Sequence, residues 1–269
     1  MNILQQIIKT KQAELAQTRR ARPIGEVERR AHDAVPPRDF FAAVTRSSGE
    51  GVRLIAEIKK ASPSAGVIVS AFDPTAIART YYACGAAALS VLTDETYFQG
   101  RLEFIKDVKI ATPLPVLRKD FIVDAYQVYE SRAAGADAVL LIAEAIEPER
   151  VGELAPLVRQ LGMTPLVEVH SKPNLMGVLE MLGPPGEGRY LLGINNRDLS
   201  LQETNRSTTV RLSKLLPPGS PFISESGLST REDVVAVQKA GACAILVGES
   251  LLRAKNRERK IRELLGRSL

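Results

Sequence analysis

The chain has 269 residues, of which 45% are hydrophobic and 25% charged, and its formal net charge is +5. Its size and composition are typical of a single globular domain built as an α/β barrel. It contains no apolar run long enough to cross a membrane and no signal peptide, so we expect a cytoplasmic protein without a membrane partner.

The basic excess is compatible with nucleic acid or with a small anionic substrate. Much of it lies at residues 19–22, 29–30 and 253–267, where no aromatic residues are interleaved for base stacking. We therefore expect solvated helix faces and no nucleic-acid partner. Two cysteines and two histidines, far apart in the chain, give none of the familiar zinc-ligand spacings, so no metal site is predicted.

The first 50 residues precede the first predicted strand. Apolar residues at helical spacing predict a helix from Met1 to about Arg20 and a short one over 39–45. We expect this leader, residues 1–50, to be a helical N-terminal extension that lies outside the core and packs on a single barrel domain. That domain is expected to comprise the whole chain, 1–269.

From Leu54 onward, short apolar runs alternate with amphipathic segments, a pattern that predicts βα units and a parallel sheet. Strands are predicted near 54–59, 87–92, 114–118, 137–142, 164–169, 190–194, 221–224 and 243–247. Helices are predicted near 74–84, 101–110, 124–134, 147–161, 172–182, 207–215, 230–240 and 256–266.

A weak internal repeat supports this count of strands. Residues 84–88, 134–138 and 240–244 share the pattern small-Gly-Ala-x-Ala, each at the end of a predicted helix and the start of a strand. At roughly 25 residues per βα unit, the copies lie two and four units apart. Eight such units in a chain of this size predict the α/β class and a closed (β/α)8 TIM barrel.

The first predicted strand, 54–59, has charged residues near its end. Leu54, Ala56 and Ile58 share one face, whereas Glu57 and Lys59 share the other with Ile55. A carboxylate and an ammonium on an inward face need each other or a polar ligand. An ion pair on an edge strand is the alternative.

Four other predicted strands also end in polar or charged residues. These are Lys119 after the third strand, Glu168 in the fifth, Asn195 and Arg197 at the end of the sixth, and Glu225 at the end of the seventh. Function in α/β barrels gathers at the carboxyl ends of the strands. Five ionisable side chains in one barrel mouth would need a ligand or each other, which predicts a functional site. They are Glu57, Lys59, Lys119, Glu168 and Glu225.

Neighbouring polar residues have simpler explanations. Arg118 and Asp120 are expected to form salt bridges with nearby helices, and His170 to be a solvated loop residue. Asp198 is expected to cap the loop after the sixth strand, and Asn196 points to the opposite face.

The loops after the seventh and eighth strands, 226–232 and 247–251, contain glycine, hydroxyl groups and helix starts. Backbone N–H groups at such positions bind phosphate, and barrels commonly place a phosphate site there. The hydroxyls of Ser62 and Ser64 are expected on the same side, because the eighth strand closes against the first.

Taken together, these motifs resemble the indole-3-glycerol phosphate synthase family of tryptophan biosynthesis over nearly the whole chain. The segments that carry the resemblance are Ala56–Lys59 with Ser62–Ser64, Leu89–Glu95 with Phe98, Leu117–Phe121, Val167–His170, Gly193–Leu199 and Ser224–Gly227. The resemblance implies a carboxy-lyase that closes the ring of 1-(2-carboxyphenylamino)-1-deoxyribulose 5-phosphate, losing CO₂ and water, without a metal or organic cofactor.

The resemblance also implies roles. Lys119 would protonate the ketone as general acid, and Glu168 would stabilise positive charge on the ring or act as base. On physical grounds a lysine among cations and apolar walls can have its pKa lowered towards neutrality, which suits this role. Glu57 and Lys59 would serve dehydration and hold the substrate. The implied catalytic set is Glu57, Lys59, Lys119, Glu168, Asn195, Glu225 and Ser226.

Binding residues follow from the same resemblance. Those implied for the substrate are Arg197, Ser62, Phe98, Phe121 and Leu199, with the last three forming an apolar slot. Those implied for phosphate are Lys59, Ser226, Gly227, Gly248 and Glu249. Some relatives have a small hydroxyl residue instead of Glu249, so this carboxylate is expected to point away from phosphate.

Two alternative functions differ in their requirements. Phosphoribosylanthranilate isomerase, another phosphosugar barrel enzyme, needs a Cys/Asp pair where this chain has Glu57 and Lys59. A basic nucleic-acid-binding protein would need aromatic or arginine-lined grooves. We expect a phosphosugar substrate and a monomer or weak homo-oligomer.

Overall fold

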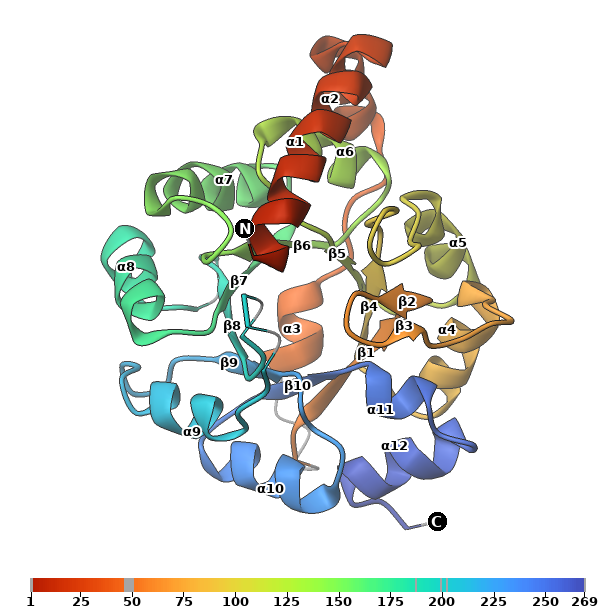
Figure 1. The fold of residues 1–269 in the computed structure, drawn as a ribbon, viewed down its shortest axis with the longest axis vertical. Coiled ribbons are helices and arrows are strands. Elements are labelled where there is room, and N and C mark those ends of the chain that lie inside the picture. The colour runs from red at the N-terminus through yellow and green to blue at the C-terminus, as the bar shows by residue number, and fades with distance from the viewer. Residues whose placement is uncertain (1, 46–50, 187, 199, 202, 269) are drawn as a thin grey trace.

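The computed structural model describes residues 2–45, 51–186, 188–198, 200–201 and 203–268. Eight parallel strands close into a barrel in the order β1-β10-β9-β8-β7-β6-β5-β4 (Figure 1). They are β1 Arg53–Ile58, β4 Ala88–Leu92, β5 Val116–Lys119, β6 Ala138–Ile142, β7 Thr164–Val169, β8 Leu191–Asn195, β9 Phe222–Glu225 and β10 Ala244–Val247. The predicted (β/α)8 barrel is confirmed, with every strand within two residues of its predicted bounds.

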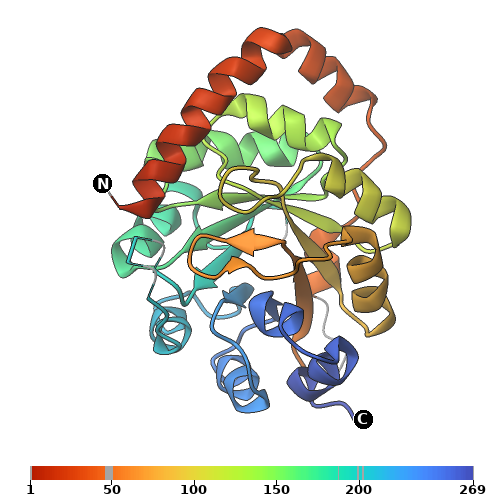
Figure 2. The same cartoon turned by 45° about the vertical axis from the view of Figure 1, so that its right-hand side comes forward.

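Helices alternate with the strands and surround the barrel (Figure 2). They are α4 Pro74–Ala83, α5 Glu103–Ala111, α6 Ala125–Ala133, α7 Pro148–Gln160, α8 Lys172–Leu182, α9 Ser207–Ser213, α10 Arg231–Lys239, α11 Glu249–Leu252 and α12 Arg257–Leu265. In the three copies of the repeat, Gly85, Gly135 and Gly241 have φ of 82°, 89° and 98°. These left-handed turns end each helix and lead into a strand, as predicted. Among the described residues, no helix has the length and apolar character needed to span a bilayer.

Side chains alternate between the two faces of each strand, and this produces two apolar cores, one between strands and helices and one inside the barrel. Leu54, Ala56 and Ile58 of β1 pack outward in the layer shared with the helices. Ile55 points inward, where it packs with inward residues of the other strands such as Leu117 and Ile223. The faces predicted for β1 are therefore confirmed, and the inward face places Glu57 above Ile55 towards the carboxyl end of the barrel.

The leader forms three helices, α1 Ile3–Ala21, α2 Ile24–Asp33 and α3 Phe40–Thr45. Our expectation that it lies outside the core was wrong for α1 and α3. Leu4 and Ile7 of α1, and Phe40 and Val44 of α3, belong to the cluster of the barrel interior. The apolar side chains inside a closed barrel would meet water at its ends, and the leader removes part of that surface from water.

One helix and one hairpin of two short strands were not predicted. The helix α2 has few apolar residues, and it packs against α6. The first loop folds back as an antiparallel pair, β2 Ala61–Ser62 with β3 Gly66–Val67, around a turn in which Gly66 has φ of 63°. Figure 2 shows this hairpin across the mouth of the barrel.

Asp137 fastens the leader to the sheet. It occupies the variable position of the second repeat and is buried immediately before β6. Its carboxylate accepts hydrogen bonds from the backbone N–H of Val116 at 2.8 Å, the backbone N–H of Arg38 at 2.6 Å and Nζ of Lys109 at 2.6 Å. One buried carboxylate thus satisfies two backbone donors and one ammonium.

We expect Asp137→Ala to destabilise the protein by about 3 kcal/mol, because it leaves buried donors unpaired. This is expected although alanine occupies the same repeat position at residue 87. Urea unfolding followed by circular dichroism measures the change. The control is Asp107→Ala on the exposed face of α5. Equal stability of the two variants would contradict the role of Asp137.

Candidate active site

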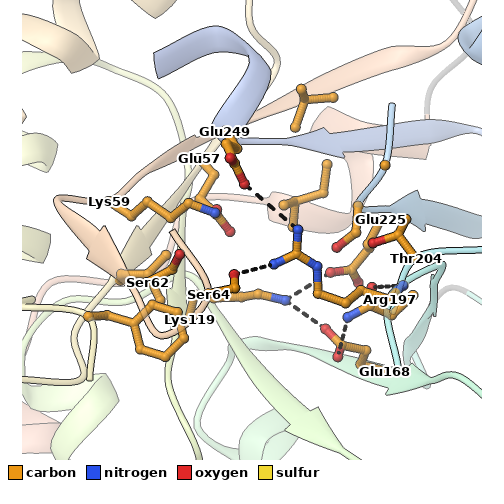
Figure 3. A pocket seen from close by; sticks show the side chains of 18 of the residues that line it. Glu57, Lys59, Ser62, Ser64, Lys119, Glu168, Arg197, Thr204, Glu225 and Glu249 are labelled. Carbon is orange, nitrogen blue, oxygen red and sulfur yellow. Dashed lines mark hydrogen bonds and ion pairs between the residues drawn. The ribbon is translucent and has the colours of Figure 1, made fainter. Parts of the chain in front are cut away.

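A cavity of about 480 Å³ lies at the carboxyl ends of the barrel strands (Figure 3). Apart from Leu199, which lies outside the described residues, every residue predicted for the site lines it. They are Glu57, Lys59, Ser62, Phe98, Lys119, Phe121, Glu168, Asn195, Arg197, Glu225, Ser226, Gly227, Gly248 and Glu249. The fold brings these residues together, and their individual roles remain predictions.

Lys119, the last residue of β5, lies between two buried carboxylates. Its Nζ atom is 2.6 Å from Oε2 of Glu168 and 2.9 Å from Oε2 of Glu225 (Figure 3). The side-chain amide of Asn195 donates to Oε1 of Glu168 at 2.9 Å. Strands β7, β8 and β9 therefore each supply one group to a cluster around a single ammonium.

The cluster holds fewer cations than carboxylates, which separates the pKa values. Burial alone lowers the pKa of Lys119, but Glu168, Glu225 and Glu57 outweigh burial and hold it above its ordinary value. Burial raises the pKa of Glu168, but attraction to Lys119 and hydrogen bonds reverse the shift and leave it lowered. Burial raises the pKa of Glu225 to about 8, since Lys119 offsets only part of that effect. These shifts favour an ammonium at Lys119, an ionised Glu168 and a protonated Glu225 at neutral pH.

Our prediction that the pKa of Lys119 falls towards neutrality was wrong. Such a shift requires apolar walls or neighbouring cations, whereas Lys119 contacts two carboxylates. The other lysine at the strand ends, Lys59, is paired with Glu57 at 2.7 Å. The sequence predicted that all five ionisable groups lie in the barrel mouth but did not give the distances between them.

Two glycines make room for the buried carboxylates. A Cβ atom at Gly193 would collide with Oε1 of Glu225, and one at Gly248 would collide with the carboxylate of Glu57. Glycine at these positions therefore lets each carboxylate lie close to a neighbouring strand or loop. In the sequence, Gly193 was noted only as part of a family motif and Gly248 only as a phosphate contact, because sequence alone does not show this steric reason.

Arg197 crosses the mouth of the cavity. Its Nη1 donates to the hydroxyl of Ser64 in the first loop at 3.1 Å, and its Nη2 is 3.7 Å from Oε2 of Glu249 (Figure 3). Glu249 also accepts from Nε of Arg253 at 2.8 Å. Burial raises the pKa of Glu249, but Arg253, Lys59 and Arg197 outweigh it and leave the pKa lowered. Arg253, which also lines the cavity, was assigned to a solvated tail because its sequence context gave no other signal.

One wall of the cavity is apolar. The rings of Phe98 and Phe121 lie with centroids 6.2 Å apart. Leu4 and Ile7 of α1 line the same cavity and pack in the same cluster. Sequence reasoning missed these two residues because an apolar helical stripe indicates packing without showing against what.

The loop after β9 has an unusual backbone. Ser226 has φ of 64° and Gly227 has φ of 73°, both left-handed. The side-chain amide of Asn196 donates to the carbonyl oxygen of Ser226 at 3.0 Å and supports this conformation. Such conformations in non-glycine residues cluster at functional sites.

The simpler explanations for neighbouring residues are largely confirmed. Arg118 pairs with Asp120 at 3.0 Å and bonds to α6, and Asp198 accepts from backbone N–H groups of its own loop. Asn196 is buried outside the cavity. His170 is not simply solvated, since its Nδ1 lies 2.8 Å from the carbonyl oxygen of Asn195.

Comparison with known proteins identifies the family. The model of the family described as indole-3-glycerol phosphate synthase matches residues 4–264. The chain belongs to the indole-3-glycerol phosphate synthase family. Proteins with that name include those of Rhodospirillum rubrum, 44% identical over 98% of this chain and 99% of the relative, and Roseiflexus castenholzii, 45% identical over 98% of each chain. The resemblance seen in the sequence is thereby confirmed.

Solved structures with distant sequences support the fold of this family member. A mutant tryptophan synthase α-subunit from Pyrococcus furiosus has a TM-score of 0.57 at 16% identity, covering 80% of this chain and 98% of that chain. A 3-hexulose-6-phosphate synthase from Salmonella typhimurium has a TM-score of 0.63 at 13% identity, covering 80% and 97%. At such identities the similarity concerns the barrel alone.

We expect Glu225→Gln to gain thermal stability relative to the wild type as pH rises from about 5 to about 9. The folded-state pKa of Glu225, about 8, exceeds the ordinary 4.5. Between these two pH values the folded wild type keeps a proton that the unfolded chain has already lost. Wild-type stability therefore falls over this range, and neutral glutamine removes that loss. Scanning calorimetry measures Tm, with exposed Glu232→Gln as control. A Tm difference that does not change with pH would contradict the assignment.

Proposed function

We propose that this protein converts 1-(2-carboxyphenylamino)-1-deoxyribulose 5-phosphate to indole-3-glycerol phosphate, CO₂ and water in tryptophan biosynthesis. The observation that carries the proposal is the ammonium of Lys119 between Glu168 and Glu225, in a cavity with an aromatic wall. Ring closure needs a proton donor for a ketone, a negative charge near an electron-rich ring and an apolar slot for that ring. Membership of the family supports the same reaction.

The cavity suits such a substrate in size and lining. Its volume of about 480 Å³ lies in the range of small-molecule sites. In the proposal the anthranilate ring lies against Phe98 and Phe121. Asn195 and Arg197 orient the carboxylate and hydroxyl groups of the substrate, and Ser62 contributes a hydroxyl from the first loop.

Ring closure comes first. The ring carbon that bears the carboxylate attacks the ketone carbon, and Lys119 gives a proton to the ketone oxygen. Lys119 carries this proton at neutral pH because its carboxylate neighbours favour the ammonium. The attack generates an alkoxide, which is basic enough to take a proton even from a lysine of raised pKa. Ionised Glu168 stabilises the positive charge that the ring gains.

Decarboxylation and dehydration follow. Loss of CO₂ returns the electron pair of the broken C–C bond to the ring. The former ketone oxygen then leaves as water, and the adjacent methylene carbon loses a proton to complete the indole. Glu57 of β1 and Lys59, just after the end of β1, lie 2.7 Å apart and form the pair proposed to exchange these protons. Glu225 and Ser226 complete the polar floor.

The phosphate is proposed to bind at the loops after β9 and β10. Ser226, Gly227 and Gly248 would offer backbone N–H groups, and Lys59 a charge. Glu249 is proposed to contribute only through its backbone, since its carboxylate is paired with Arg253 at 2.8 Å.

The isomerase alternative has less support. Its Cys/Asp pair would require a cysteine at the cavity, and neither Cys84 nor Cys243 lines it. The cytoplasmic location and the monomeric or weakly oligomeric state remain predictions that accompany the proposed function.

We expect Lys119→Met to reduce kcat by about a thousandfold, because the ketone loses its proton donor. The appearance of indole fluorescence measures turnover, and Lys106→Met on the exposed face of α5 is the matched control. Turnover near the wild-type rate in Lys119→Met, with substrate binding unchanged, would show that Lys119 is not the general acid.

Removal of the phosphate tests the anion site. We expect a substrate analogue without phosphate to bind about a hundredfold more weakly, because charge-assisted hydrogen bonds are lost. Inhibition of the wild-type enzyme gives both affinities. Equal affinities would remove the loops after β9 and β10 from the phosphate site.

A further inference from the structure

Lys11 of α1 is a buried lysine outside the catalytic cluster. Its exposed fraction is 7%, and its Nζ lies 2.9 Å from Oδ2 of Asp94 and 3.2 Å from Oδ1 of Asp120. Burial alone lowers the pKa of Lys11, but Asp120 and Asp94 outweigh it and leave the pKa raised. The two aspartates follow β4 and β5, so one residue of the leader joins two barrel loops.

The same two aspartates hold the aromatic wall. Oδ1 of Asp94 accepts from the backbone N–H of Tyr97 at 2.7 Å and of Phe98 at 3.2 Å. Oδ1 of Asp120, the oxygen nearest to Lys11, accepts from the backbone N–H of Phe121 at 2.8 Å. Lys11 therefore contacts two aspartates whose carboxylates hold the backbone of Phe98 and Phe121.

Further contacts tie α1 to the loop after β4. The hydroxyls of Thr10 and Tyr97 are 3.0 Å apart, and the hydroxyl of Thr96 donates to Glu14 at 2.7 Å. Leu4 and Ile7 precede Lys11 on one helical face and line the cavity. Figure 2 shows α1 running along the rim of the barrel on this side.

We propose that Lys11 is a positioning residue that closes the aryl slot, by clamping Asp94 and Asp120 together and seating Leu4 and Ile7 over Phe98 and Phe121. Lys11 does not line the cavity, and its ion pairs are with Glu14, Asp94 and Asp120 rather than with the loops proposed to bind phosphate. Loss of the Lys11 side chain therefore weakens binding of the aromatic part of a ligand and leaves binding of the phosphate unchanged. This inference rests on the proposed function.

The test compares a ligand with an aromatic ring and a ligand without one. Inhibition constants are measured for indole-3-glycerol phosphate and for glycerol 3-phosphate in the wild type, in Lys11→Met and in Lys9→Met. Lys9 is an exposed lysine of the same helix and serves as control. We expect Lys11→Met to weaken indole-3-glycerol phosphate about tenfold and glycerol 3-phosphate less than about twofold, with Lys9→Met unchanged.

Asp94→Asn provides a second, milder variant. Asparagine retains an oxygen for the N–H groups of Tyr97 and Phe98 but loses the attraction to Lys11, so the same selective weakening is expected. If Lys11 acts through Asp94, the effects of Lys11→Met and Asp94→Asn are less than additive in the double variant. The double variant also lacks the unpaired buried carboxylate, so it remains informative where Lys11→Met alone does not fold.

The outcomes separate the two proposals. Equal weakening of both ligands, or no weakening of either, in Lys11→Met and Asp94→Asn overturns the role of Lys11 and leaves the proposed function intact. Absence of turnover by the wild type contradicts the proposed function itself.

Discussion

The site depends on one ammonium shared by two buried carboxylates. Without Lys119, Glu168 and Glu225 would be like charges in the barrel interior, which is costly. The charge of Lys119 lowers the pKa of Glu168, whereas burial keeps the pKa of Glu225 raised, so the two neighbouring carboxyl groups differ in how readily they ionise. In the proposed reaction, the same arrangement supplies a proton donor and a negative charge.

Barrel closure creates this arrangement. Parallel neighbours in register bring the ends of β5, β7, β8 and β9 to one level, and the strands turn alternate side chains inward. The absence of a side chain at Gly193 leaves space for Glu225 beside β8. The outward faces pack apolar residues against helices, whereas the inward faces carry a second apolar cluster and, at the carboxyl ends of the strands, the charged groups of the site.

The N-terminal leader adds apolar residues to the core inside the barrel. Phe40 and Val44 join the interior cluster from α3, and Leu4 and Ile7 join it from α1. Because α1 is also held through Lys11, the apolar wall of the cavity and the attachment of the leader depend on the same contacts. The first loop also covers part of the cavity mouth, because the hydroxyl of Ser64 accepts a hydrogen bond from Arg197.

Periodicity in the sequence determined the eight βα units, and glycine in the repeats located where helices turn into strands. Alternation within a strand also determined that Glu57, Lys119, Glu168 and Glu225 face inward, because side-chain direction is a local property. Only the tertiary structure decided which of these groups touch. That contact gave Lys119 a raised pKa, where the sequence had suggested a lowered one. It likewise decided that α1 reaches the cavity, because distances between strands and the place of a helix depend on closure of the whole barrel.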